Sequence, residues 1–112
     1  MEDARHALAR DALQQGRLAE AEELFAAIVS ENPHDTEALY FAAAMQLHRG
    51  DVSGAHTSIE RAIDKNPKEA RYWVAMGQIL ARQKQYDAAE TAFESALLIE
   101  PGNGDAYTNL GA

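Results

Sequence analysis

Four histidines are the residues of this 112-residue chain whose type best suits metal binding. They are His6, His34, His48 and His56, and none of them forms an HxxxH or HExxH pair. His48 and His56 flank a predicted turn around Gly50, but two histidines without a nearby carboxylate or thiolate make a poor zinc site. The sequence therefore predicts solvated histidines at helix ends, with no metal and no other cofactor.

Clusters of carboxylates are the candidates for acid–base chemistry. Glu20, Glu22 and Glu23 lie close together, and Glu90 and Glu94 form an i,i+4 pair of like charge. On exposed helices both groups are more simply solvated faces. The chain has no cysteine, no Gly-rich phosphate loop and no Ser–His–Asp order that stands out. Because its polar residues fall in turns and on solvated faces rather than in a pocket, we predict that this chain is not an enzyme.

The net charge of −8 limits the classes of partner. Nucleic acids and anionic membrane surfaces both attract basic proteins, so we expect neither as a partner. The acidity fits either solubility or the binding of a basic partner. No apolar run is long enough to span a bilayer, and the polar N-terminus does not resemble a signal peptide, so the expected compartment is the cytoplasm.

Three prolines mark the ends of the helices that carry these residues. Pro33, Pro67 and Pro101 are the only prolines in the chain, and they stand 34 residues apart. Proline ends a helix because it lacks an N–H and clashes with the preceding turn. A fixed period of this length is typical of an array of helix–turn–helix units. The spacing therefore predicts an all-α chain built from stacked units.

Positions one period apart carry residues of similar size. The small and the large recurring residues are Ala21, Ala55 and Ala89, and Phe25, Ile59 and Phe93. Within each unit the apolar residues step by three and four, as on one stripe of a helix. The pattern predicts seven helices, at about residues 2–15, 19–31, 36–49, 53–65, 70–83, 87–99 and 104–111. Asp35, Ser53 and Asn103 are the predicted N-caps, and Lys84 stands where the first two units have a turn glycine.

These recurring positions resemble the tetratricopeptide repeat. The third unit carries the pattern most fully, in Trp73, Met76, Gly77, Leu80, Tyr86, Ala89, Phe93, Ala96 and Pro101. The first unit departs most, with Arg5 and Ala12 in two places that are usually apolar. The resemblance covers essentially the whole chain and implies an α–α superhelix, a TPR solenoid, as one domain over residues 1–112. Its repeats would span about residues 2–35, 36–69 and 70–103, followed by the first helix of a truncated fourth repeat at 104–112.

The C-terminal residues match only a first helix, through Tyr107, Leu110 and Gly111. Repeat arrays normally end in a polar capping helix, so we expect a fragment of a longer protein, the alternative being a natural end with a minimal cap. An apolar face left open there could drive self-association. Bacterial tetratricopeptide segments are often fused to transferases. The resemblance therefore also allows a targeting or oligomerisation segment of a larger enzyme whose catalytic domain is absent here.

In tetratricopeptide arrays the first helices line a concave groove that takes a peptide or a partner helix. Carried over, the resemblance implies a partner-binding site formed by Arg10, Tyr40, Phe41, Arg71, Val74, Gln78 and Arg82. Tyr40 and Phe41 fit either binding anchors or packing on the neighbouring first helix. The arginines fit either contacts to ligand carboxylates and carbonyls or a simple helix-favouring choice. The expected function is a protein interaction scaffold that binds a protein or peptide partner.

One subtype of the family holds the C-terminal carboxylate of chaperones in a clamp of lysines, asparagines and an arginine. The matching places here hold His6, Arg10, Phe41, Arg71 and Ala75. Only Arg71 keeps the expected charge at its place, and both asparagines are absent. The chain therefore does not look like a receptor for chaperone C-termini.

Overall fold

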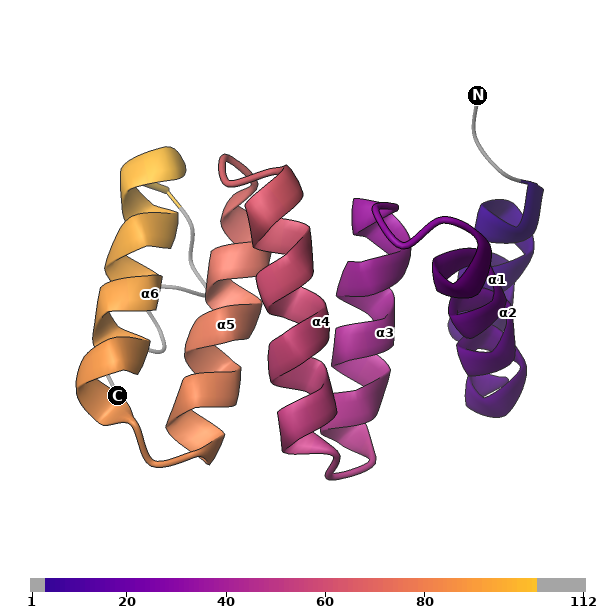
Figure 1. The fold of residues 1–112 in the computed structure, drawn as a ribbon, viewed down its shortest axis with the longest axis horizontal. Helices are drawn as coiled ribbons and strands as arrows, with labels where there is room; N and C mark the ends of the chain where they lie inside the picture. The colour runs from indigo at the N-terminus through magenta and orange to yellow at the C-terminus, as the bar shows by residue number, and fades with distance from the viewer. Residues whose placement is uncertain (1–3, 103–112) are drawn as a thin grey trace.

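The computed structural model describes residues 4–102, and these form α-helices joined by short turns (Figure 1). The helices of this part are α1 (Ala4–Gln14), α2 (Leu18–Glu31), α3 (Thr36–His48), α4 (Val52–Lys65), α5 (Ala70–Arg82) and α6 (Tyr86–Ile99). Each helix begins and ends within two residues of a predicted one. The predicted seventh helix and the predicted N-cap Asn103 lie outside the described residues. No helix within residues 4–102 has the length and apolar character needed to cross a bilayer.

Consecutive helices pack in pairs, and the pairs stack side by side along the chain (Figure 1). α1 packs on α2, α3 on α4 and α5 on α6, while α2 contacts α3 and α4 contacts α5. The first helices of the second and third units, α3 and α5, also touch each other. This order of contacts is the all-α superhelix that the 34-residue period predicts, in which each unit contacts its neighbours.

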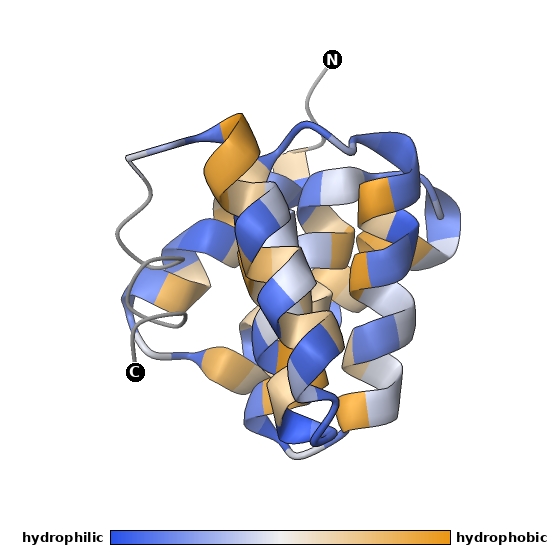
Figure 2. Cartoon of the chain, turned by 90° about the vertical axis from the view of Figure 1, so that its left-hand side faces the viewer, coloured by the Kyte–Doolittle hydropathy of each residue, from blue (hydrophilic) through white to orange (hydrophobic). Residues whose placement is uncertain are grey.

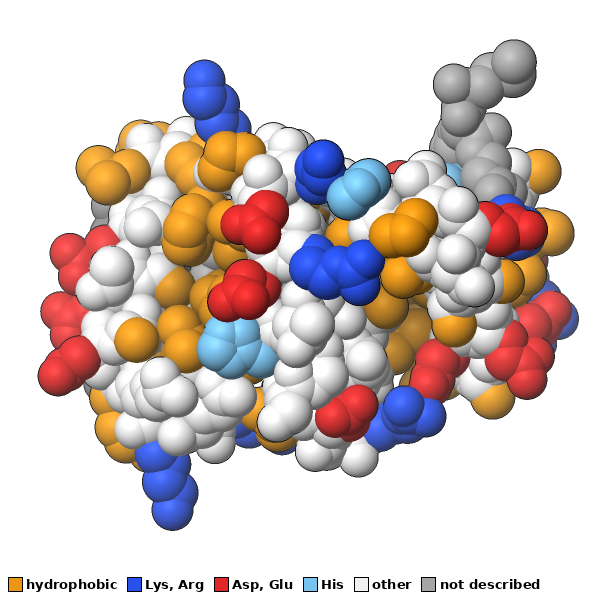
Figure 3. Space-filling view, viewed as in Figure 1, with side chains coloured by type: hydrophobic (Ala, Val, Ile, Leu, Met, Phe, Trp, Pro, Cys, Tyr) orange, Lys and Arg blue, Asp and Glu red, His pale blue; other side chains and the backbone are white. Residues whose placement is uncertain are grey.

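The recurring residues form the core. Phe25 and Ile59 are fully covered, and Phe93 is buried as well. Phe25 lies in a cluster between the first and second units, while Ile59 and Phe93 lie in a larger cluster that joins the second and third. The recurring alanines are also buried, so that paired helices approach closely. Acidic side chains line the outer edge of α6 in Figure 3, where hydrophobic side chains are grouped between α6 and α4.

One predicted N-cap is confirmed by the structure and another is wrong. Asp35 is the N-cap of α3, and its Oδ1 accepts a hydrogen bond from the Ala38 N–H at 3.0 Å. The prediction that Ser53 caps α4 is wrong, because Asp51 takes that role and accepts from the Gly54 N–H at 3.1 Å. The Asp51 side chain reaches the N–H three residues on, so α4 begins at Val52 and Ser53 lies inside its first turn.

A residue with a left-handed backbone conformation follows the first helix of each unit. Gly16 and Gly50 have φ angles of 76° and 86°, and Lys84 takes the same place with a φ of 63°. Glycine adopts this conformation without steric cost, whereas a lysine Cβ lies close to the carbonyl oxygen that follows. The turn at Lys84 is therefore strained, as its sequence predicts.

Replacing Lys84 by glycine is expected to raise the free energy of unfolding by about 1 kcal/mol, because the left-handed cost is removed and only part of it is lost to unfolded-chain entropy. Chemical denaturation of the two proteins measures this difference. Lys84→Ala is the matched control, since it removes the charge but keeps the Cβ. An equal gain in both variants would show that the charge, and not the backbone, is responsible.

Candidate functional site

A continuous hollow runs between α3 and α5, on the first helices of the second and third units. Its inner part, of about 160 Å³, lies between Tyr40, Ala44 and Ala75. A second part, of about 380 Å³, extends to Arg82, and both parts share Leu47 and Gln78. The alanines leave room that larger side chains would fill. We call this hollow the first-helix strip and define it by Tyr40, Ala44, Leu47, Ala75, Gln78 and Arg82.

An aromatic and cationic group closes one end of the first-helix strip. The half-buried Tyr40 ring lies 5.4 Å from the Tyr72 ring. The Arg71 guanidinium lies 5.1 Å from the centre of the Tyr40 ring and 3.3 Å from a carboxylate oxygen of Glu69. Stacking on the ring and pairing with Glu69 hold this exposed guanidinium in place. Its remaining N–H groups can donate to a carboxylate or a backbone carbonyl.

Two other predicted site residues have internal partners. Phe41 is half-buried and stacks on Phe25, with ring centroids 4.9 Å apart, in the core between the first two units. Phe25 belongs to α2, so this contact is with a second helix and not with the neighbouring first helix that the packing alternative names. Arg10 forms an ion pair of 2.7 Å with Glu37, which joins α1 to α3. The exposed Gln78 and Arg82 line the first-helix strip directly.

Val74 lies away from this surface. It is 8% exposed and belongs to the larger core cluster. One and two periods earlier stand Tyr40, which is half-buried, and His6, which is 4% exposed. At this position Val74 and His6 are thus buried, whereas Tyr40 is half-buried and also lines the first-helix strip.

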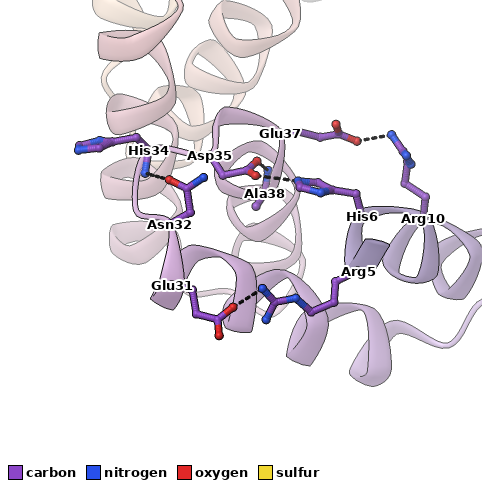
Figure 4. Close-up of polar contacts among 9 residues, drawn as sticks. All are labelled: Arg5, His6, Arg10, Glu31, Asn32, His34, Asp35, Glu37 and Ala38. Carbon is purple, nitrogen blue, oxygen red and sulfur yellow. Dashed lines mark hydrogen bonds and ion pairs between the residues drawn. The ribbon is translucent and has the colours of Figure 1, made fainter. Parts of the chain in front are cut away.

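His6 corrects the prediction that the histidines are solvated. Its Nε2 lies 2.8 Å from Oδ2 of Asp35, and Figure 4 shows the two side chains pointing toward each other between α1 and α3. The same Asp35 side chain caps α3 through Oδ1. Arg5 and Glu31 form a further ion pair near this contact. The contact of His6 with Asp35 therefore ties α1 to the start of α3, and the Arg5–Glu31 pair ties α1 to α2. The residue period was the one signal for the burial of His6, which shares its position with Val74.

The remaining candidates for chemistry are dispersed. His34 and His48 are exposed, while the half-buried His56 lies 3.1 Å from the Gln83 side-chain oxygen. Within residues 4–102, no three His, Cys, Asp or Glu side chains are grouped so that they could hold a metal ion. Glu22 forms an ion pair of 2.7 Å with Arg49, and Glu20 pairs with Arg17. Both carboxylates thus have structural partners, and the Glu22–Arg49 pair borders a cavity between the first two repeats.

The last turn of α6 is apolar and exposed. Leu98 and Ile99 are 86% and 37% exposed, whereas the first two units have Ser, Glu, Asp and Lys at these positions. Figure 2 shows this hydrophobic end of α6 at the top of the helix that faces the viewer. Self-association through the C-terminal face stays a prediction, since residues 103–112 lie outside the described part. Light scattering across a dilution series would contradict it by showing a strict monomer.

The helix pairs and their period have a counterpart in known proteins. A family model for the tetratricopeptide repeat matches residues 12–79, and a second one matches residues 70–103. The chain belongs to the tetratricopeptide repeat family. The first-helix strip lies on α3 and α5, the first helices of the second and third repeats.

Three known proteins are similar to this chain in sequence or in fold. The chain is 29% identical over 111 residues to the mouse (Mus musculus) protein O-mannosyl-transferase TMTC1, and this match covers 96% of the chain but 12% of that protein. The second TPR domain of human RPAP3, solved in complex with the HSP70 peptide SGPTIEEVD, superimposes with a TM-score of 0.86 and 19% identity, covering 96% and 90% of the two chains. An O-GlcNAc transferase of Thermobaculum terrenum gives 0.87 and 24% identity, covering 98% of this chain and 22% of the enzyme.

Proposed function

We propose that this chain is a non-enzymatic scaffold that binds a peptide or an extended segment of a protein partner along the first-helix strip. The observation that carries this proposal is the continuous hollow between α3 and α5, which has polar side chains at both ends. The RPAP3 domain supports it, because a domain of similar fold holds a peptide. The HSP70 peptide itself is not the proposed ligand, since the clamp places here hold residues such as Phe41 and Ala75.

Each part of the strip has a role in such binding. Ala44 and Ala75 allow a partner backbone to approach the helices closely. The exposed Gln78 amide can donate to a peptide carbonyl and accept from a peptide N–H. Arg71 and Arg82, at the two ends, can hold carboxylates or carbonyls with their planar guanidinium groups. Tyr40 adds apolar contact area at low entropic cost, because its ring is already fixed by Tyr72 and Arg71.

Binding peptides selected from a displayed random library provide the test. We expect Gln78→Glu/Arg82→Glu to weaken the affinity of such a peptide at least about tenfold, because the strip loses a cation and gains two carboxylates. Isothermal titration calorimetry measures this change. The matched control is Thr57→Glu/Lys65→Glu, which alters the charge equally on exposed positions of α4 and should change affinity less than about twofold. Equal losses in both variants, or none in the first, would refute binding in the strip.

A second candidate function is a targeting or oligomerisation segment of a larger enzyme. Two similar proteins are transferases, and the chain corresponds to 12% and 22% of their lengths. In such a protein the array would bind partners or copies while catalysis takes place in another domain. The full reading frame tests this idea, since a frame without a catalytic domain would contradict it.

A further inference from the structure

A separate cavity lies between the first and second repeats, beside the turn that joins α1 to α2. It has a volume of about 490 Å³, and most of its wall is formed by Leu13, Leu18, Ala19, Ala44 and Met45. The ion pair between Glu22 and Arg49 forms part of its rim. The Leu18 side chain, at the start of α2, is 43% exposed. The cavity is therefore an apolar space with a polar edge.

The residue period shows why the wall of this space is mostly apolar. One period after Ala44 stands Gln78, and one period after Ala19 stands Ser53. The pair equivalent to Glu22 and Arg49 is His56 and Gln83, whose side chains are 3.1 Å apart. The equivalent place between the second and third repeats holds two hollows of about 380 and 300 Å³, which are lined by longer and more polar side chains. With small residues at 19 and 44, the first interface has one space of about 490 Å³ with a mostly apolar wall.

We propose that this cavity binds the side chain of a large apolar residue in the partner segment, with acidic residues flanking it. The inference rests on the proposed groove function, because Ala44 borders both the cavity and the first-helix strip. An apolar cavity of about 150 Å³ is already enough to hold benzene, so the present one has room for a leucine or an aromatic side chain. Burying such a side chain would also cover Leu18.

The charges of the first-helix strip favour acidic residues on either side of the apolar residue in the partner segment. The strip beside the cavity ends at Arg82, and Arg71 lies at its other end. Glu22, the acidic residue on the rim of the cavity, is already paired with Arg49 at 2.7 Å. A segment that lies across the strip therefore meets cationic groups, although the whole chain carries a net charge of −8. Local complementarity of this kind decides which partner is accepted.

Methyl NMR of protein labelled with [methyl-13C]methionine tests the proposal. The probes are three tripeptides with acetylated and amidated ends, DLD, DSD and KLK. Met45 lines the cavity, and the buried Met76 lies in the other core cluster as an internal reference. We expect DLD to shift the Met45 signal saturably with a Kd on the order of millimolar, and to leave Met76 unchanged. DSD should not shift Met45, and KLK should bind several-fold more weakly than DLD.

Two variants identify the site. Ala19→Phe fills the cavity from α2 without touching the first-helix strip, and it should raise the Kd of DLD at least about tenfold. Ser53→Phe, the same change one period later, is its control and should leave the Kd unchanged. Ala44→Gln, which copies Gln78, should act like Ala19→Phe if the latter fails to fold.

Several results would overturn the proposal. Equal shifts of Met45 with DSD and DLD, or a DLD response that survives both cavity-filling variants, would exclude a pocket for an apolar side chain. KLK binding as tightly as DLD would exclude acidic flanks. The outcome is separable from the proposed function, since Gln78→Glu/Arg82→Glu tests the strip alone. If that variant loses library-peptide binding while DLD gives no Met45 response, binding in the strip is supported and binding in the cavity is contradicted.

Discussion

Replacing Asp35 by alanine is expected to lower the free energy of unfolding by about 2–4 kcal/mol. Asp35 has two roles in the structure, since Oδ1 caps α3 and Oδ2 contacts Nε2 of His6 at 2.8 Å. Loss of an N-cap costs about 1 kcal/mol, and depriving a buried polar group of a partner costs about 1–3 kcal/mol. Because His6 is 4% exposed, water replaces that partner poorly. Urea denaturation followed by circular dichroism measures the loss.

The cap of α4 provides the matched control for this prediction. Asp51 accepts from the Gly54 N–H as Asp35 accepts from the Ala38 N–H, but its carboxylate has no buried histidine partner recorded in the described structure. Asp51→Ala should therefore cost only about 1 kcal/mol. A double-mutant cycle between His6→Ala and Asp35→Ala should show a coupling of about 1 kcal/mol or more. If the two cap variants lose the same free energy of unfolding and the cycle shows no coupling, the contact with His6 adds nothing to stability.

Replacing Gly77 by alanine should destabilise the protein by about 1–2 kcal/mol, although alanine is the better helix former by about 1 kcal/mol. A Cβ at this position of α5 would lie 2.5 Å from Cε1 and 2.7 Å from Cδ1 of Phe93. The ring is buried in the core and cannot move away without repacking. The overpacking cost, up to about 3 kcal/mol, therefore exceeds the gain in helix propensity. Thermal and chemical denaturation measure the difference.

The second repeat shows how this loss could be reversed. It carries Ala43 and Ile59 at the positions that hold Gly77 and Phe93 in the third repeat. Gly77→Ala/Phe93→Ile copies that pair and should be more stable than expected from adding the two single changes. Simple additivity, or a stabilising Gly77→Ala, would contradict the close contact between α5 and α6.

The architecture follows from the sequence because it depends on a repeated local pattern. Proline spacing fixes the units, and the recurring Phe25, Ile59 and Phe93 report burial at a position that is the same in every unit. Lys84 could be recognised for a similar reason, since the two other units have glycine at the turn. Such features need no knowledge of distant contacts.

The features that were missed depend on contacts between units. The burial of His6 arises from Asp35, 29 residues later, and no local pattern marks a histidine as covered. Capping by Asp51 in place of Ser53 depends on which side chain can reach the Gly54 N–H after a left-handed turn. The cavity beside Ala44 appears only when the side chains of three helices are placed together. Comparing each residue with those one period away would have pointed to His6 and to Ala44.

The central claim is that a partner segment lies along the first-helix strip, and paramagnetic relaxation enhancement tests it most directly. A library-selected peptide carrying a nitroxide label is added to the 15N-labelled chain, and the broadening of each amide signal is measured. We predict strong broadening at Ala44, Ala75 and Gln78, with little effect at Glu60 of α4 or Glu94 of α6, which are exposed on second helices. Broadening confined to α4 and α6, with the signals of α3 and α5 unaffected, would contradict the account.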